Sequence, residues 1–212
     1  MSEPLLQAVN LECERDDRVL FRDLSFSILP GTLIRVEGPN GSGKTTLLRI
    51  LAGLNDSYSG DLLWRGQRRD GYREDFLRNM LYLGHRPGIK PLLTPIENLR
   101  ALMAGRRSVP DKVLWQALEG TGLGGFQAVP CHSLSAGQQR RVALARLLIA
   151  DEPLWILDEV FTAIDIHGVA ALEKLLIERV ENGGAIVVTT HHDLRLPAMQ
   201  RVTLGGGDGY DR

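Results

Sequence analysis

The chain has 212 residues, of which 43% are hydrophobic and 24% are charged, and its formal net charge is -1. These values are typical of a soluble globular protein with one or two domains, they exclude a strongly basic chain, and nothing in them points to nucleic acid or an anionic membrane as a partner. Two cysteines without metal-type spacing exclude a disulfide framework, and no stretch approaches the roughly 18 apolar residues of a membrane span. The opening Met-Ser-Glu-Pro lacks a basic segment followed by an apolar one, so we expect no signal peptide.

Residues 5–36 are predicted to form strands joined by turns. Apolar side chains alternate approximately with serine over 24–28, which is the period of a half-buried strand. Asp16-Asp17 and Pro30-Gly31 are turn signals. Residues 33–36 then form a short apolar strand that leads directly to a glycine-rich loop.

That loop has the sequence Gly38-Pro39-Asn40-Gly41-Ser42-Gly43-Lys44-Thr45, and a predicted helix over 44–52 follows it. Successive backbone N–H groups and a helix N-terminus together bind phosphate, and glycine allows the tight curl. We expect Lys44 to contact the β- and γ-phosphates and the Thr45 hydroxyl to bind Mg²⁺, and we include Thr46 among the nucleotide contacts. The sequence therefore predicts a nucleoside triphosphate site.

Further strands are predicted over 60–66 and over 80–83, and a mostly helical stretch runs from Thr94 to about Ala150. Apolar runs over 154–157 and 185–188 have the composition of buried parallel strands, with an amphipathic helix over 169–180 between them. Short arginine pairs are expected on the solvated surface. These pairs are Arg68-Arg69, Arg106-Arg107 and Arg140-Arg141.

A second magnesium ligand should follow a buried strand, and two segments offer an Asp-Glu pair after apolar residues. One is residues 147–152, ending in Asp151-Glu152, and the other is residues 154–159, ending in Asp158-Glu159. The first choice would cut the helix that begins near residue 136 to about two turns, with no loop after it. We therefore favour Asp158 as a magnesium ligand, through water, and Glu159 as the residue that polarises the attacking water.

The sequence predicts an α/β fold in which a nucleotide-binding core carries a helical insert. We expect one domain over 1–212, with the core at about 1–84 and 151–204, the helical subdomain at about 85–150, and a mobile tail at 205–212. No linker divides the chain into independent domains.

The loop at 38–45, taken with Leu134-Ser135-Ala136-Gly137-Gln138, resembles the ATP-binding cassette (ABC) ATPases. The resemblance implies a P-loop NTPase fold of the ABC type with an antiparallel β part at its N-terminus. It implies that Ser135, Gly137 and Gln138 open a helix and cap the ATP held by a second copy of the chain. It also implies that His191, after Thr189-Thr190, contacts the γ-phosphate, whereas the adjacent His192 is more often a surface residue.

Several positions depart from the general ABC pattern. His85 stands where most of the family has a glutamine that contacts the nucleotide site, and a neutral imidazole there can still accept or donate one hydrogen bond. Val160 replaces a proline, and Ala136 replaces a glycine. The aromatic residue that stacks on adenine is missing, and its place falls near Arg15, which either stacks on the base or is an exposed turn residue.

Longer segments, at 13–16, 84–90, 134–147 and 154–165, resemble the ATPase subunits of cytochrome c maturation systems. That resemblance implies an enzyme that hydrolyses ATP with Mg²⁺ at the cytoplasmic face of the bacterial inner membrane. It implies membrane partners of the CcmB type with CcmC and CcmD, and delivery of haem to the chaperone CcmE. ATP would drive either haem export or release of the haem-loaded chaperone, and we favour the second.

Two other classes of protein compete with this interpretation. An ABC ATPase that is not coupled to transport would usually carry two cassettes or a coiled-coil insert, and the sequence shows neither. A GTPase would need a guanine-reading Asn-Lys-x-Asp motif, which is absent from the sequence.

Overall fold

The computed structural model describes residues 3–104, 107–162, 164–192 and 199–205. These residues divide into two compact units. The first comprises the chain up to residue 82, residues 152–159 and the chain from residue 176 onward, and the second comprises residues 83–151 and 160–175. Each unit has its own elements and its own core.

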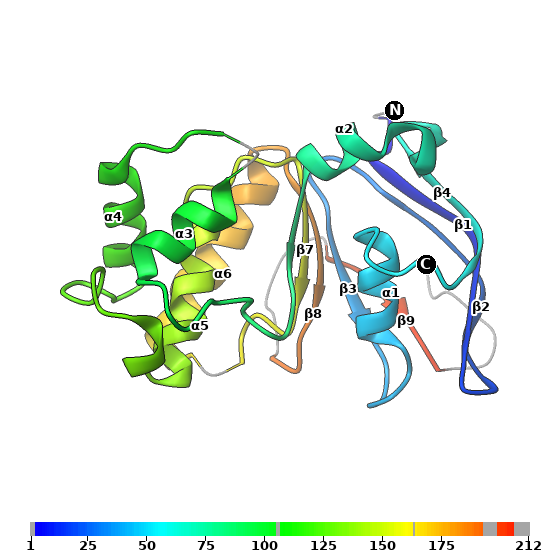
Figure 1. Ribbon diagram of the computed structural model, residues 1–212. Helices are drawn as coiled ribbons and strands as arrows, with labels where there is room; N and C mark the ends of the chain where they lie inside the picture. Colours follow the sequence, from blue (N-terminus) through cyan, green and yellow to red (C-terminus); the bar gives the residue numbers. More distant parts are fainter. Residues whose placement is uncertain (1–2, 105–106, 163, 193–198, 206–212) are drawn as a thin grey trace. The chain divides into compact units, whose positions relative to one another are not determined.

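The described part of the first unit contains two sheets, and helices connect some of their strands along the chain (Figure 1). Its elements are β1 (Leu6–Arg15), β2 (Arg18–Ile28), β3 (Leu33–Glu37), α1 (Lys44–Leu51), β4 (Ser59–Trp64), β5 (Gln67–Arg68), the 3₁₀ helix η1 (Arg69–Tyr72), α2 (Arg73–Arg78), β6 (Met80–Leu83), β7 (Leu154–Asp158), β8 (Ala185–Thr189) and β9 (Met199–Thr203). The last residue of β6 already belongs to the second unit.

The antiparallel sheet has the strand order β2-β1-β4-β5. β1 and β2 form a hairpin whose turn is Asp16-Asp17, and both aspartates adopt a left-handed backbone, with φ of 51° and 58°. Aspartate tolerates this conformation better than most residues, which explains why this pair ends the strand. The predicted strand–turn–strand pattern at the N-terminus is therefore confirmed.

The parallel sheet has the strand order β6-β7-β8-β3-β9. β8 pairs in parallel with both β7 and β3, and every residue of β7 and β8 is buried. Strands buried on both faces are continuous apolar runs, as predicted for these two segments. Because parallel strands present their carboxyl ends at one edge, residues 158–159 and 189–191 meet at the same edge as the loop after β3.

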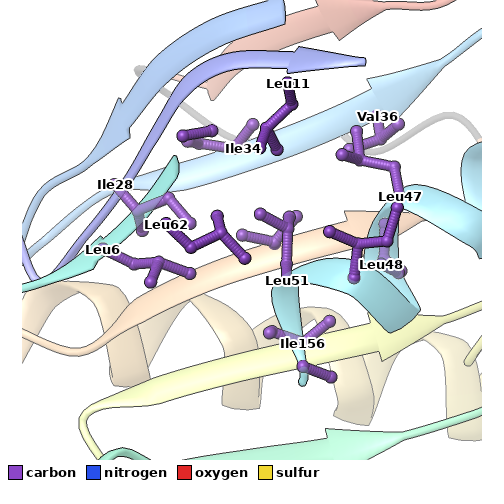
Figure 2. Packing of buried hydrophobic residues seen from close by; sticks show 14 of the residues in the cluster. Leu6, Leu11, Ile28, Ile34, Val36, Leu47, Leu48, Leu51, Leu62 and Ile156 are labelled. Carbon is purple, nitrogen blue, oxygen red and sulfur yellow. The ribbon is translucent and has the colours of Figure 1, made fainter. Parts of the chain in front are cut away.

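Helix α1 contributes the apolar face that joins the two sheets in one core. Leu47, Leu48 and Leu51 of this helix are fully buried and cluster with residues of both sheets, including Leu11 and Ile156 (Figure 2). Removing this much apolar surface from water fixes the position of α1, and therefore of the loop that precedes it.

The second unit is mostly helical. Its elements are α3 (Pro95–Met103), α4 (Asp111–Gly120), η2 (Cys131–Ser133), α5 (Ala136–Ala145), η3 (Arg146–Leu148) and the first part of α6 (Ile166–Glu181), whose last residues belong to the first unit. Leu99, Leu118 and Val142, one from each of α3, α4 and α5, are fully buried in a separate hydrophobic core. None of the described helices is both long and apolar enough to cross a bilayer.

The fold class and most predicted elements are confirmed, and the structure differs from the prediction in several places. Helix α6 begins at Ile166, three residues before the predicted start at 169, and residues 160–175 group with the helical unit. Strand β9 was not predicted. The expected domain partition stays a prediction, and the tail after residue 205 lies outside the described residues.

Candidate functional site

The loop between β3 and α1 is held in a backbone conformation that favours glycine. Gly38, Gly41 and Gly43 have φ of 144°, 80° and 96°. A Cβ on Gly38 would lie 2.5 Å from the carbonyl oxygen of Leu204 and 2.6 Å from the hydroxyl of Ser42. The curl predicted from the glycine spacing therefore has a steric cause that is specific to this fold.

The interior of the loop is polar. Ser42 is 4% exposed, and its hydroxyl has no hydrogen-bond partner among the described residues. Pro39, Asn40 and Gly41 are exposed at the rim of the loop. Gly43 is the N-cap of α1, and no side chain caps this helix. A buried hydroxyl and an uncapped helix N-terminus fit the oxygens of a phosphate group.

Lys44 places its charge over this loop. Its Nζ donates hydrogen bonds to the carbonyl oxygens of Gly38, at 2.6 Å, and Pro39, at 3.0 Å. Both acceptors are neutral, so a phosphate oxygen would be a stronger partner for the ammonium group. Thr46 is half-buried in the first turn of α1, next to Thr45.

A carboxylate and a hydroxyl meet beside the loop. The Thr45 hydroxyl donates to Oδ1 of Asp158 at 3.3 Å, and Asp158 is only 1% exposed at the end of β7. Mg²⁺ prefers hard oxygen ligands and is usually held by one or two protein groups together with substrate phosphates. The residues present therefore fit Mg²⁺, although no group of three or more His, Cys, Asp or Glu side chains forms a metal site among the described residues.

Glu159 follows Asp158 in a strained backbone conformation. Its φ is 52°, which is uncommon for a residue with a side chain, and its N–H bonds to the carbonyl and to the hydroxyl of Thr189, each at 3.1 Å. Nε2 of His191 lies 3.6 Å from Oε1 of Glu159. Backbone strain of this kind is often found at functional positions. His192 instead donates its backbone N–H to the Thr190 hydroxyl in a local turn.

Tyr82 on β6 lies close enough to Asp158 for the two side chains to interact electrostatically. Burial raises the pKa of Tyr82 to about 12, and the negative charge of Asp158 adds to the increase, while Arg49 opposes it. The phenol is therefore a neutral hydrogen-bonding group over the whole physiological range.

The signature segment lies in the second unit and opens a helix, as predicted. Ser135 is the N-cap of α5, and its Oγ accepts the N–H of Gln138 at 3.2 Å. Oε1 of Gln138 accepts the N–H of Ser135 at 2.9 Å, which completes a capping box. Gly137 lies in the first turn between them. These side chains are thus already engaged with the backbone that they would present to a ligand.

His85 is exposed, and its backbone is held by the signature helix. Nη1 of Arg140 on α5 donates to the carbonyl oxygens of Gly84, at 2.9 Å, and His85, at 3.1 Å. Arg140 is 4% exposed and Arg69 is 2% exposed, so the prediction that these arginine pairs are solvated was wrong for both residues. A guanidinium can be buried when backbone carbonyls accept its donors, and sequence spacing does not reveal this.

The loop before α3 is held by hydrogen bonds from α3 and from the segment at residues 131–132. The side chain of Asn98 is buried and bonds to the backbone of Lys90 in both directions, at 2.8 and 3.0 Å. The N–H groups of Cys131 and His132 donate to the carbonyls of Leu93 and Pro91. Leu92, between them, is 84% exposed.

The structure brings together five of the predicted site residues in the first unit. They are Lys44, Thr45, Asp158, Glu159 and His191. His85, Ser135, Gly137 and Gln138 belong to the second unit. Arg15 is exposed at the end of β1 and pairs with Asp16 at 3.3 Å. Sequence reasoning missed Thr189, whose only signal was a hydroxyl at the end of an otherwise apolar strand. The functional roles of all these residues stay predictions.

Comparison with known proteins gives a consistent result over most of the chain. A family model described as ABC transporter matches residues 21–162. The cytochrome c biogenesis ATP-binding export protein CcmA of Hahella chejuensis (strain KCTC 2396) is 56% identical over 203 residues, covering 95% of this chain and 96% of the relative. The protein of the same name from Pseudomonas fluorescens (strain Pf0-1) is 54% identical over 202 residues, with coverage of 95% and 96%.

Solved structures share the fold. An ATP-binding subunit of an ABC transporter is 25% identical with a TM-score of 0.79, covering 88% of this chain and 79% of that chain. The dimeric structure of MJ0796, a bacterial ABC transporter cassette, is 24% identical with a TM-score of 0.79, covering 93% and 94%.

Proposed function

The chain belongs to the ABC transporter family and is an ABC-type ATPase, and from this premise we propose that it is the ATP-hydrolysing subunit of a cytochrome c maturation complex. The observation that carries the proposal is the identity of 56% across 95% of the chain with a protein named for cytochrome c biogenesis and export. The alignment covers nearly the full length of both chains, so the resemblance is not confined to one motif or subdomain.

Residues of the first unit have separate roles in ATP binding and hydrolysis. Lys44 and the N–H groups at the start of α1 bind the β- and γ-phosphates of ATP. Thr45 and Asp158 would hold Mg²⁺, which when bound neutralises charge that develops on the phosphate oxygens. Glu159 orients and polarises the attacking water as general base, and His191, which lies 3.6 Å from it, contacts the γ-phosphate.

A second copy of the chain completes the site. Ser135, Gly137 and Gln138 at the start of α5 cap the ATP that the other copy holds in its phosphate loop, and His85 is a further nucleotide contact. One cassette with this fold has been solved as a dimer, which supports the arrangement. ATP then closes the pair, and hydrolysis reopens it.

The complex acts at a membrane through its partners. We propose attachment to the cytoplasmic face of the bacterial inner membrane through a CcmB-like subunit, with CcmC and CcmD, and delivery of haem to the chaperone CcmE. ATP hydrolysis drives release of the haem-loaded chaperone, and haem export is the other use of the same energy.

The first test uses a strain that lacks its own copy of this subunit. Wild-type protein restores covalent haem attachment to c-type cytochromes, and Glu159→Gln does not, although it still binds ATP. Loss of the general base lowers the turnover number by about 100-fold to 10,000-fold. Glu152→Gln is the matched control, because Glu152 ends the rejected Asp-Glu pair and lies outside β7.

The outcomes separate the alternatives. If the chaperone accumulates with haem bound in the Glu159→Gln strain, ATP drives release, and if it stays free of haem, ATP drives export. Restoration by Glu159→Gln but not by Glu152→Gln would refute the assignment of the base. Normal cytochromes without the protein would indicate an ATPase that is not coupled to this pathway.

A further inference from the structure

Thr189 occupies a position where β8 turns from apolar to polar. It is the last residue of this strand, is fully buried, and pairs in register with Asp158 of β7. The residues before it are Ala185-Ile186-Val187-Val188, all apolar. A valine would continue this run, so the hydroxyl at residue 189 is a local exception that needs a partner.

The hydroxyl has two partners, both at the catalytic edge. Oγ1 of Thr189 donates to Oδ1 of Asp158 at 2.6 Å and accepts the N–H of Glu159 at 3.1 Å. A hydroxyl has one proton to donate and two lone pairs to accept with, so it can make both bonds at once. One side chain therefore holds both the carboxylate of residue 158 and the backbone of residue 159.

We propose that Thr189 is a positioning residue that fixes the orientation of the Asp158 carboxylate for Mg²⁺ and holds Glu159 in its left-handed backbone. The proposal rests on the proposed roles of Asp158 and Glu159 in ATP hydrolysis. Residues that bond to a metal ligand orient it, and their loss typically weakens metal affinity 10-fold to 100-fold.

Relative distances explain why Thr189, rather than Thr45, has this role. Both hydroxyls donate to the same oxygen, Oδ1 of Asp158, at 2.6 Å for Thr189 and 3.3 Å for Thr45. Thr189 is buried within the sheet, whereas Thr45 is exposed. Thr189 thus holds the carboxylate, while Thr45 has the weaker bond and can turn its oxygen to the metal.

The strained backbone of Glu159 also depends on Thr189. Glu159 has φ of 52°, and a residue with a side chain stays in this region only when its surroundings hold it there. Its N–H has two acceptors, and both belong to Thr189. Removing the hydroxyl takes away one of these two acceptors.

The test compares Thr189→Val, which removes the hydroxyl at nearly constant shape, with Thr189→Ser, which keeps it. Thr32→Val is the matched control, because the Thr32 hydroxyl donates only to the Leu29 carbonyl, away from the site. Binding of Mn²⁺ is followed by electron paramagnetic resonance with a saturating non-hydrolysable ATP analogue. Nucleotide affinity is measured separately in EDTA, and amide hydrogen exchange is measured without nucleotide or metal.

We expect Thr189→Val to bind Mn²⁺ about 10-fold more weakly, with nucleotide affinity in EDTA unchanged. The Glu159 amide should exchange faster in the same variant. Thr189→Ser and Thr32→Val should match the wild type in both measurements. If Thr189→Val does not fold, Thr189→Cys, whose thiol is a weak donor, should shift Mn²⁺ affinity in the same direction.

Two results would overturn the proposal. One is unchanged Mn²⁺ affinity in a folded Thr189→Val or Thr189→Cys protein. The other is an equal loss of metal-dependent and metal-free nucleotide affinity, which would give Thr189 a structural role only. Failure of the proposed function would look different, because the wild-type protein would then not restore covalent haem attachment to c-type cytochromes, whatever its Mn²⁺ affinity.

Discussion

The chain presents two helix N-termini to nucleotide in the proposed mechanism, and they are built in opposite ways. Helix α1 begins after Gly43 and has no side-chain cap, whereas α5 begins after Ser135 and has a complete capping box. An uncapped N-terminus leaves its N–H groups for a phosphate, and a capped one has already satisfied part of them. The phosphate loop is thus ready to bind alone, while the signature must exchange internal bonds for external ones.

The largest expected effect is on nucleotide affinity, which a substitution at the start of α1 should lower much more than one at the start of α5. Lys44→Ala removes a charge-assisted contact to phosphate and should weaken binding of a fluorescent ATP analogue to the dilute protein by about 100-fold. Ser135→Ala should leave this affinity within about twofold of wild type, since the signature acts on the other copy's nucleotide. Equal losses in the two variants would contradict the difference between the two helix N-termini.

The next test concerns the glycine that fixes the loop before the uncapped helix α1. Gly38→Ala places a Cβ 2.5 Å from the Leu204 carbonyl at φ of 144°, so it should lower the free energy of unfolding by roughly 2 kcal/mol or more and abolish nucleotide binding. Gly124→Ala is the control, because nothing lies within 4 Å of its added Cβ. Chemical denaturation and the same fluorescence titration measure both quantities.

The chain offers a matched pair for the capped start. Thr94 caps α3 with the same type of capping box, formed with Glu97. Thr94→Ala and Ser135→Ala should each lower the free energy of unfolding by about 1 kcal/mol. Only Ser135→Ala should also lower the ATPase rate. A loss of ATPase in both variants would mean that the signature acts through stability alone.

The smallest expected effect concerns Tyr82, which lies near Asp158 in the first unit. The pKa of Tyr82 is raised to about 12, so the folded protein keeps the phenol proton between about pH 10 and 12 while the unfolded chain loses it. Stability is therefore full below pH 10 and falls as the pH rises towards 12. Tyr82→Phe should lose less stability over this pH range than the wild type. Allowing for solvent screening, the difference in the free energy of unfolding, measured by denaturation at pH 10 and above, should be on the order of 1 kcal/mol. Identical profiles would show that Tyr82 is not buried in solution.

Sequence reasoning succeeded where short-range rules act. The turn at Asp16-Asp17 and the start of α1 after Gly43 follow from local backbone preferences. The start of α5 after Ser135 was implied by the family resemblance. Strand β7 follows from a continuous apolar run, and η3 occupies 146–148, where the rejected alternative needed a strand.

It failed where only tertiary contacts decide. Strand β9 has the sequence Met-Gln-Arg-Val-Thr, and only Val202 is buried, so an edge strand of this kind carries no apolar pattern. Arg140 is buried because carbonyls from a distant segment accept its donors. Thr189 has a role only because β8 lies beside β7.

The left-handed backbone of Glu159 has a consequence for engineering. Glycine would occupy φ of 52° with less strain, yet a carboxylate is needed there, so folding and turnover make opposing demands on one residue. Selection for heat resistance alone would therefore enrich inactive chains with glycine at position 159. A thermostability screen of this protein must retain an assay for hydrolysis at every round.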